Sequence, residues 1–160
     1  VYSHFGYNLK VTDMQAAVGV AQLKKLPSFV ARRRHNFARL HAALADLGDA
    51  FVLPEATAHA DPSWFGFLLT CRDGVDRAKI VPYIEGQGIQ TRMLFAGNLT
   101  KHPCFDAMRA SGGGYRVAGT LAATDRIMND TFWLGVYPGL TDAKIDYMAQ
   151  VVRDAVHATR

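Results

Sequence analysis

Most of the first 48 residues are predicted to form two consecutive helices, and no other feature constrains the fold as strongly. Thr12 and Gln15 have the spacing of a capping box, in which each side chain bonds to a backbone N–H of the other residue, so a helix is expected to begin there. Pro27 is expected to end it at about residue 26, because proline lacks the N–H of a helical bond. Ser28 is expected to cap a second, longer helix. Later elements must then cover the apolar faces of both helices.

The two helices differ in their side chains. The first is poor in charge and rich in alanine, so we expect it to be buried on more than one face and to contribute to an interface core, which is typically depleted in charge. The second has one apolar and one basic face, and the basic face is expected to be solvated rather than to bind nucleic acid. The apolar stripe consists of Phe29, Val30, Phe37, Leu40, Leu44 and Leu47. The basic residues are Arg32, Arg33, Arg34 and Arg39.

Beyond Pro62 the sequence alternates between strand-like and helix-like segments. Dense apolar runs predict strands, and capped amphipathic segments predict helices. The expected strands cover residues 64–71, 89–95 and 131–137. The expected helices run from Asp76 to Gly86, shortened or kinked by Pro82, from Val117 to Met128, and from Thr141 onward, where Ile145, Met148, Val152 and Ala155 share a stripe. This order predicts an α+β fold, or an α/β layer, in which a small sheet packs against helices.

Composition narrows the class of protein. A length of 160 residues, with 49% hydrophobic and 20% charged residues, is typical of one globular domain or of part of a larger one. The net charge of +4 permits an anionic ligand but is too small for a nucleic-acid-binding surface. Two cysteines in unrelated contexts indicate neither a disulfide framework nor a metal site. Without a long apolar run or a signal peptide, we expect no membrane partner and a cytoplasmic location.

Two stretches carry a resemblance to a known family. The sequences "GYNLKVTDMQAAVGVAQLKKL" and "TDRIMNDTFWLGVYPGLTDAKID" resemble the sugar aminotransferase family of the DegT/DnrJ/EryC1/StrS type. The resemblance implies the C-terminal part of a type I aminotransferase fold, which binds pyridoxal phosphate. It also implies that residues 1–27 end the large domain, as a cofactor loop and interface helix, and that residues 28–160 form the small domain. We therefore expect the chain to be a piece of a longer protein.

Three further stretches point to a subgroup of that family. The sequences "DPSWFGF", "TRMLFAGNLTKHPCF" and "NDTFWLGVYPGLT" are similar to dehydrases of the CDP-4-keto-6-deoxyglucose 3-dehydrase type. The similarity implies a lyase of deoxysugar and lipopolysaccharide biosynthesis. Such a lyase uses pyridoxamine phosphate to remove the C3 hydroxyl of a nucleotide-linked 4-keto-6-deoxy sugar. In the type member a [2Fe-2S] cluster accompanies the cofactor, which would call for a flavin or iron–sulfur reductase as a partner.

The resemblance places the catalytic groups outside this chain. Ordinary aminotransferases hold the cofactor through a lysine, which the dehydrases replace with histidine, and either residue would precede the Gly-Tyr-Asn loop. The aspartate that pairs with the pyridine nitrogen and the cysteines that bind a cluster would precede it as well. His4 is too close to the loop to be the catalytic histidine. The chain is thus expected to contain no catalytic residue and no metal ligand, and to be inactive alone.

In family members the Gly-Tyr-Asn loop reaches the active site of the partner subunit and contacts the cofactor phosphate. The resemblance therefore implies a homodimer with shared active sites, and it assigns cofactor binding to Asn8 first and to Tyr7 and Lys10 after it. An amide side chain supplies two donors for phosphate oxygens, and Gly6 permits close approach of the backbone. The alternative for Asn8 is a role in supporting the turn before the helix.

The stretch "QTRMLFAGNLTKHP" lines the substrate pocket in the resembling enzymes. Arg92 would bind the diphosphate of a nucleotide-linked sugar with paired donors, or else form a surface salt bridge. Asn98 and Lys101 would donate to phosphate or to sugar hydroxyls. Phe95 would stack on a base or ring, with core packing as its alternative.

Other assignments remain open. Trp64, Phe65 and Phe67 either wall the sugar pocket from one face of a strand or belong to the core of the sheet. For the whole protein, the first alternative to a dehydrase is a sugar-nucleotide aminotransferase in which lysine holds the cofactor. The second alternative is a stand-alone interaction module without catalytic groups.

Overall fold

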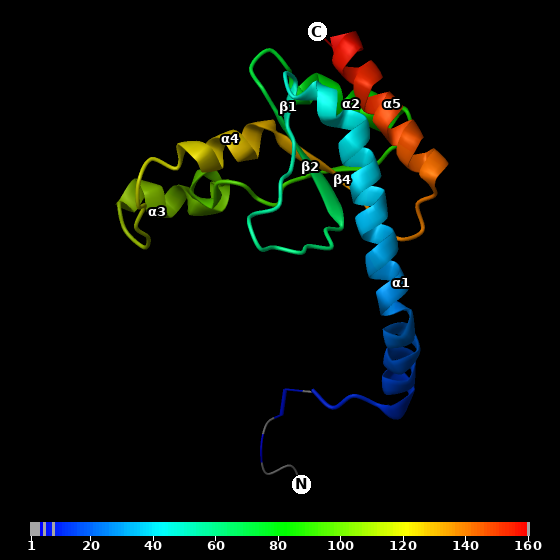
Figure 1. The fold of residues 1–160 in the computed structure, drawn as a ribbon. Coiled ribbons are helices and arrows are strands. Elements are labelled where there is room, and N and C mark those ends of the chain that lie inside the picture. Colours follow the sequence, from blue (N-terminus) through cyan, green and yellow to red (C-terminus); the bar gives the residue numbers. More distant parts are fainter. Residues whose placement is uncertain (1–3, 5, 8, 160) are drawn as a thin grey trace.

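A long helix leads from the N-terminal segment into a small sheet that further helices cover (Figure 1). The computed structural model describes residues 4, 6–7 and 9–159. The described residues among 4–12 belong to no helix or strand, and we call this segment the arm. The elements are α1 (Asp13–Leu44), η1 (Ala45–Leu47), β1 (Phe51–Val52), β2 (Gly66–Cys71), α2 (Arg77–Gly86), β3 (Thr91–Met93), η2 (Leu99–Lys101), η3 (Pro103–Phe105), α3 (Asp106–Ser111), α4 (Ala122–Asp130), β4 (Thr131–Gly135) and α5 (Asp142–Thr159).

The sheet is antiparallel throughout, with the strand order β1-β2-β4-β3. Strands β2 and β4 form its centre, where Leu69 pairs with Phe132. Strand β3 joins β4 at the edge, with Arg92 opposite Trp133. A small antiparallel sheet packed with helices is the α+β fold that the sequence predicts.

Alternate residues of the central strands enter one hydrophobic core. Phe67 and Leu69 on β2 are buried, as are Phe132 and Leu134 on β4. Side chains of α1, α2 and α5 complete the cluster, among them Leu40, Leu44, Ile80, Ile84, Ile145 and Val152. All four residues of the stripe predicted on the last helix are buried, so this prediction is confirmed. We call the sheet, α2, α5, η1 and the part of α1 from Val30 onward the body.

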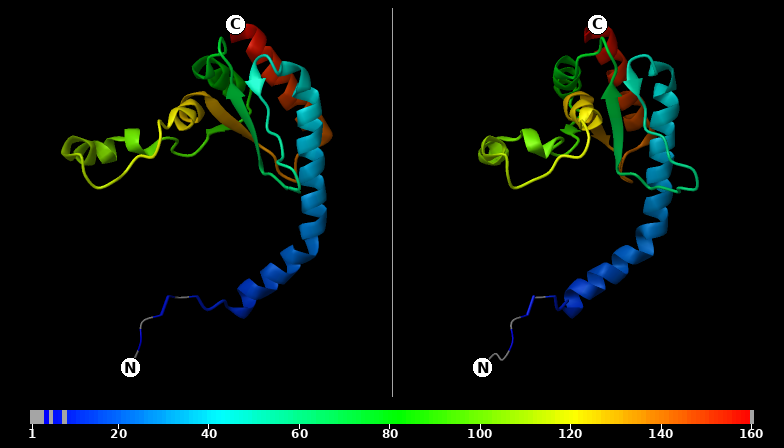
Figure 2. Two further views of the ribbon diagram at one scale, coloured as in Figure 1. Left: turned by 60° about the vertical axis from the view of Figure 1, so that its left-hand side comes forward. Right: turned by 90° about the vertical axis from the view of Figure 1, so that its left-hand side faces the viewer.

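Helix α1 continues through Pro27, so the predicted division into two helices is wrong. The side chains around the proline are exposed, which lets water bond to the carbonyl that loses its N–H partner. Ser28 caps no helix, because its hydroxyl donates to the Lys25 carbonyl at 2.8 Å. The helix bends along its length, as Figure 2 shows, and a proline is a common cause of such a bend. The predicted domain boundary after residue 27 lies inside this helix and stays a prediction.

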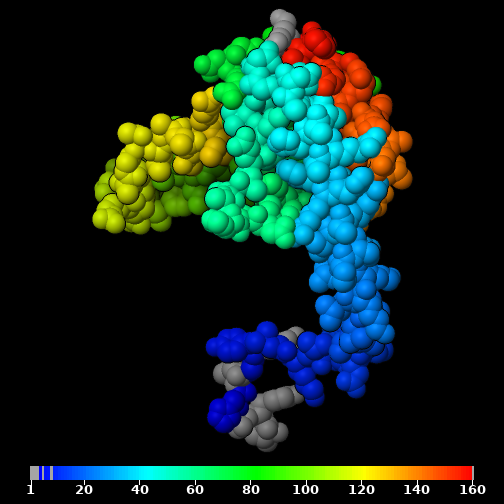
Figure 3. All heavy atoms as spheres, in the orientation of Figure 1, coloured from blue at the N-terminus to red at the C-terminus, as the bar shows by residue number. Residues whose placement is uncertain are grey.

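The two halves of α1 lie in different surroundings. The upper half, Val30–Leu44, belongs to the body, where it packs against α5, and it contains three buried residues. The lower half, Asp13–Phe29, has only exposed side chains. Figure 3 shows the lower half as a slender column that projects from the body. Neither α1 nor any other helix in the described part of the chain is both long and apolar enough to cross a membrane.

Four other elements differ from the prediction. Pro82 does not shorten α2, which extends to Gly86 with the proline inside it. Helix α4 begins at Ala122 rather than near residue 117, because Leu121 has a φ of 54°, which a right-handed helix excludes. Strand β1 and helix α3 were not predicted, because two and six residues are too few for a clear periodic pattern.

Candidate functional site

The arm carries the predicted cofactor residues, of which Asn8 lies outside the described residues. The predicted capping box is present at its end: the Thr12 hydroxyl accepts from the Gln15 N–H at 3.4 Å, and the Thr12 N–H donates to Gln15 Oε1 at 3.0 Å. Tyr7 is 91% exposed, and Lys10 is exposed as well. Neither side chain has a hydrogen bond or ion pair within the described part of the chain. Their donors are therefore free to meet a ligand or a second chain.

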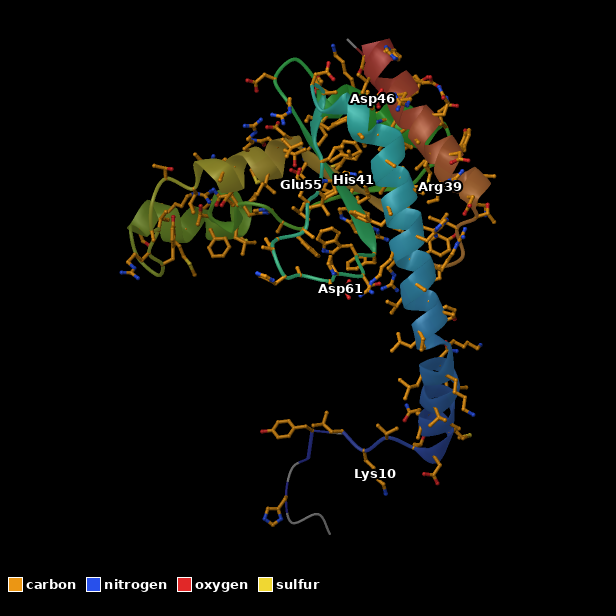
Figure 4. The ribbon with its side chains drawn as sticks, viewed as in Figure 1. Lys10, Arg39, His41, Asp46, Glu55 and Asp61 are labelled. Carbon is orange, nitrogen blue, oxygen red and sulfur yellow. The ribbon has the colours of Figure 1, made fainter. Side chains whose placement is uncertain are left out.

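The arm lies apart from the rest of the molecule. Figure 1 shows it turning away from the start of α1, below the body, and Figure 4 shows Lys10 in this segment. The chain therefore does not bring Tyr7 and Lys10 close to the predicted substrate residues.

Those residues lie at and beyond β3. Residues 94–130, which we call the lobe, extend sideways from the sheet (Figure 2). The helical elements of the lobe, η2, η3, α3 and α4, contain no buried residue. The lobe is consequently held together by polar contacts more than by a hydrophobic core.

Arg92 and Phe95 are both presented to solvent. Arg92 is exposed on β3 and has no ion pair with another described residue, so the alternative of a surface salt bridge is not seen. Phe95 is 84% exposed, which excludes the core-packing alternative. Its φ of 49° lies in the left-handed region, which few residues other than glycine adopt. The Arg92 guanidinium and the Phe95 ring are thus both exposed where the lobe begins.

Asn98 and Lys101 share one carboxylate, that of Asp125 on α4. Asn98 is 3% exposed; its Nδ2 donates to Asp125 Oδ1 at 2.7 Å, and its Oδ1 accepts from the Thr100 N–H at 3.1 Å and the Thr100 hydroxyl at 2.6 Å. The Lys101 Nζ lies 2.8 Å from Asp125 Oδ2. Hydrogen bonds from Lys101 and then Asn98 lower the pKa of Asp125. Asn98 therefore holds the loop together, while the Lys101 ammonium remains largely accessible.

Gly97 lets α4 approach this loop closely. Its φ is 63°, and a Cβ at this position would lie 2.3 Å from Cγ of Met128. The Met128 sulfur accepts from the Asn98 N–H at 3.3 Å. The Arg77 guanidinium of α2 donates to the Met128 carbonyl at 2.7 Å, which ties α4 to the body.

Arg109 braces the far side of the same loop. Its guanidinium donates to the carbonyls of Thr100 and His102 and pairs with Asp106. His102 Nε2 lies 2.6 Å from the Ala96 carbonyl, to which it donates. Three of these contacts have backbone carbonyls as acceptors, so they stabilise the backbone conformation of the loop directly.

The three aromatic residues near β2 have different surroundings. Phe67 is fully buried, with its ring centroid 4.9 Å from that of Phe37. Phe65 is 61% exposed and packs edge-on against Trp133. Trp64 is half-buried and lines a surface hollow between α1 and residues 54–62, near His41, Glu55 and Asp61 (Figure 4). Core packing therefore holds for Phe67 alone.

The basic face of the upper half of α1 is paired with acidic residues of α5. Arg32 lies 2.6 Å from Asp142, and Arg39 lies 2.7 Å from Asp146. The pKa values of both carboxyl groups are lowered, chiefly by the hydrogen bonds from Arg32 and Arg39 respectively. These pairs fasten α1 to α5, as the position of Arg39 in Figure 4 illustrates.

Sequence reasoning missed three residues that shape the lobe. Asp125 is 27 positions from Asn98, and no sequence spacing connects the two. Arg109 lies in a helix too short to predict. Gly97 had a usable signal, because a glycine after a strand indicates a turn. Among the described residues, no cluster of three His, Cys, Asp or Glu side chains could hold a metal ion.

Curated relatives match almost all of the chain. The lipopolysaccharide biosynthesis protein RfbH of Salmonella typhimurium is 50% identical over 149 residues, which are 92% of this chain and 33% of the relative. The dTDP-4-dehydro-2,6-dideoxy-D-glucose 3-dehydratase of Saccharopolyspora spinosa is 46% identical over 157 residues, 97% of this chain and 33% of the relative. The chain thus spans 33% of the length of these two relatives.

A solved structure shares the fold. The GDP-4-keto-6-deoxy-D-mannose-3-dehydratase of E. coli with bound hydrated PLP superposes with a TM-score of 0.77 at 27% identity, covering 92% of this chain and 36% of that one. The model of the DegT/DnrJ/EryC1/StrS aminotransferase family matches residues 1–153. This match includes the arm, α1, the lobe and the first part of α5, up to Arg153. The chain therefore belongs to the DegT/DnrJ/EryC1/StrS aminotransferase family.

Proposed function

We propose that the chain is the C-terminal part of a sugar-nucleotide 3-dehydratase. The enzyme would use pyridoxamine or pyridoxal phosphate to remove the C3 hydroxyl of a nucleotide-linked 4-keto-6-deoxy sugar. The observation that carries this proposal is 46% identity over 157 residues, through both the arm and the lobe, to a relative named as a 3-dehydratase. The PLP bound in the structural neighbour supports the choice of cofactor.

The arm is proposed to bind the cofactor phosphate through Asn8, with Tyr7 and Lys10 beside it. The hydroxyl of Tyr7 and the ammonium of Lys10 are exposed and unengaged, and they are the kind of donors that a phosphate group requires. Because the arm lies away from the lobe of its own chain, its ligand would lie in a partner subunit. The exposed apolar side chains of the lower half of α1 support a homodimer with shared active sites.

The start of the lobe is proposed to bind the substrate. Arg92 offers paired N–H donors to a diphosphate, and the Lys101 ammonium adds a point charge. Phe95 offers an open ring face for a base or a sugar ring. Asn98 has one amide hydrogen left after its bond to Asp125, and we propose that this hydrogen reaches the substrate.

The chain's share of the reaction is binding and orientation. When bound, the cofactor supplies the conjugated system through which the C3–O bond breaks. The group that moves the proton is proposed to lie in the part of the enzyme outside this chain. The same holds for the ligands of any [2Fe-2S] cluster and for the docking site of a flavin or iron–sulfur reductase, because this chain has two cysteines and Cys71 is buried. Burial raises the pKa of the Cys71 thiol to about 11, which keeps this thiol protonated at neutral pH. A cytoplasmic location of the enzyme is part of the proposal.

The reaction itself is tested with the full-length protein. Incubation with a nucleotide-linked 4-keto-6-deoxy sugar should give a product that has lost the C3 hydroxyl, detected by mass spectrometry. An amino sugar formed in the presence of glutamate would instead favour the sugar aminotransferase. Failure of both reactions with CDP-, dTDP- and GDP-linked substrates would contradict the proposal and favour a non-catalytic interaction module.

The cofactor role of the arm is tested separately. In the full-length protein, Asn8→Ala should weaken pyridoxamine phosphate retention, measured by absorbance after dialysis. Gln150→Ala is the matched control, because it removes an exposed amide on α5. Equal retention in the two variants would refute the role of Asn8. The 160-residue chain alone should bind little cofactor, and tight stoichiometric binding in a titration would refute the shared site.

A further inference from the structure

We propose that Asp125 is a positioning residue, which holds the side chains of Asn98 and Lys101 in the orientation in which they meet the substrate. This inference rests on the proposed function, since it takes the start of the lobe to be the substrate site. Asp125 acts through its two partners and makes no contact with the substrate itself.

The geometry of the carboxylate carries the proposal. One oxygen accepts from Asn98 Nδ2 at 2.7 Å, and the other lies 2.8 Å from Lys101 Nζ. Asn98 in turn accepts from the N–H and the hydroxyl of Thr100. A single side chain of α4 therefore holds the N-cap residue and the last residue of η2, and it holds Thr100 indirectly through Asn98.

Apolar packing cannot perform this task. Helix η2 contains no buried residue, and its Leu99 is exposed. The carboxylate, by contrast, sits on a firm support, because Arg77 of the body donates to the carbonyls of Met128 and Thr131 at the end of α4, at 2.7 and 3.0 Å. Asp125 thus links the side chains of Asn98 and Lys101 to this support.

The ion pair also leaves Lys101 able to bind an anion. An ammonium has three donors, and Asp125 occupies one of them. Fixing the long lysine side chain before the substrate arrives lowers the entropy lost on binding. The opposite effect is that Asp125 competes with the substrate for Lys101. The two effects predict opposite results. Removing the carboxylate weakens substrate binding if Asp125 positions Lys101, and it strengthens substrate binding if Asp125 competes with the substrate for Lys101.

The test uses the full-length protein loaded with its cofactor. Isothermal titration calorimetry with GDP, dTDP and CDP first identifies the nucleoside diphosphate that the wild type binds. Asp125→Ala should then raise the Kd by about tenfold, the size expected for losing charge-assisted hydrogen bonds. Asp125→Asn should recover part of this loss, because its amide oxygen still accepts from Asn98.

Asp130→Ala is the matched control, since it removes a carboxylate of the same helix that has no hydrogen bond or ion pair with any described residue. It should bind as the wild type does, and the cofactor absorbance should be the same in all variants. The combination of Asp125→Ala with Asn98→Ala should lose less binding free energy than the sum of the two single losses, because the two side chains belong to one hydrogen-bonded unit.

Each other outcome counts against the proposal. Unchanged or tighter binding by Asp125→Ala overturns the positioning role while leaving the proposed function intact. If Asp125→Ala also loses its cofactor, the nucleotide affinity of Asp125→Asn is the deciding measurement. This variant forms no ion pair with Lys101, so wild-type affinity would overturn the positioning role. A wild-type protein that binds none of the three nucleotides contradicts the proposed function, and this role with it, before any substitution is made.

Discussion

The upper and lower halves of α1 have the same backbone conformation and opposite surroundings. Leu40 in the upper half is fully buried, whereas Leu23 in the lower half is 66% exposed. A helix of 17 exposed residues would be marginal in isolation, so the lower half owes its conformation to its capping box and to propagation from the packed half. Helix formation and burial are thus separate properties of this chain, and burial alone depends on what packs against it.

The largest effect should come from truncating one leucine in each half. In the 160-residue chain, Leu40→Ala should lower the free energy of unfolding by about 2–5 kcal/mol, since it opens a cavity in the core. Leu23→Ala should change it by less than about 0.5 kcal/mol, because exposed side chains contribute little. Urea denaturation followed by circular dichroism measures both values. Equal losses of unfolding free energy in the two variants would contradict the difference between the two halves of α1.

A buried amide provides the next test. Asn36 is fully buried in the upper half, and its Nδ2 donates to the carbonyls of Tyr137 and Leu140 at 3.0 and 3.2 Å. Asn36→Ala should cost about 2 kcal/mol, because it leaves buried backbone acceptors with fewer donors. Gln22→Ala, an exposed amide of the lower half, is the control and should fall within about 0.5 kcal/mol of the wild type. Similar urea midpoints for the two variants would contradict the difference between the halves.

The comparison extends to the lobe, which resembles the lower half in lacking buried helical residues. Gly97→Ala should open the lobe locally, because the new Cβ would collide with Met128, and the cost should exceed that of Gly119→Ala by about 1 kcal/mol or more. Gly119 is the control because its φ is also positive, at 78°, but a Cβ there meets no atom within 4 Å. Hydrogen exchange of amides 97–101 reports the opening. Equal protection in both variants would show that the close approach of α4 is unimportant.

The smallest effect concerns the ion pairs of the upper half with α5. The pKa values of Asp142 and Asp146 are lowered by Arg32 and Arg39, so these carboxylates stabilise the fold above their ordinary pKa of about 4. This contribution is lost as the pH falls through the lowered values in the folded state. The urea midpoint should therefore decline below about pH 4 and decline less in Asp142→Asn. Parallel pH profiles of variant and wild type would exclude a role for the pairs.

The parts of the fold that the sequence predicts are those with long, one-sided patterns. The stripe of α5, the strand around Phe67 and the capping box at Thr12 were all predicted, because each depends on residues close together in the chain. Pro27 misled the prediction, since a proline in an exposed helix bends it without ending it. The contact between Asp125 and Asn98 could not be predicted, because it depends on how α4 folds back on the loop.

In the candidate site, too, the local features were predictable from the sequence and the tertiary contacts were not. The family resemblance identified the segments around Arg92 and Lys101 from local motifs. Which of these side chains are free and which are engaged became clear only from the fold: Arg92 has no partner among the described residues, whereas Asn98 is almost wholly enclosed by its own loop. Exposure is a property of the tertiary arrangement, and local motifs do not encode it.

The two halves of α1 form one continuous helix, and this continuity restricts how the chain can change in length. Each helical residue adds a rise of about 1.5 Å along the axis and a rotation of about 100° around it. Inserting or deleting a single residue between Leu26 and Val30 would therefore swing the arm to another side of the helix, although every contact of the body would survive. Only insertions or deletions close to a whole number of helical turns would return Tyr7 and Lys10 to their original direction. The length of the helix therefore determines the side on which the arm lies.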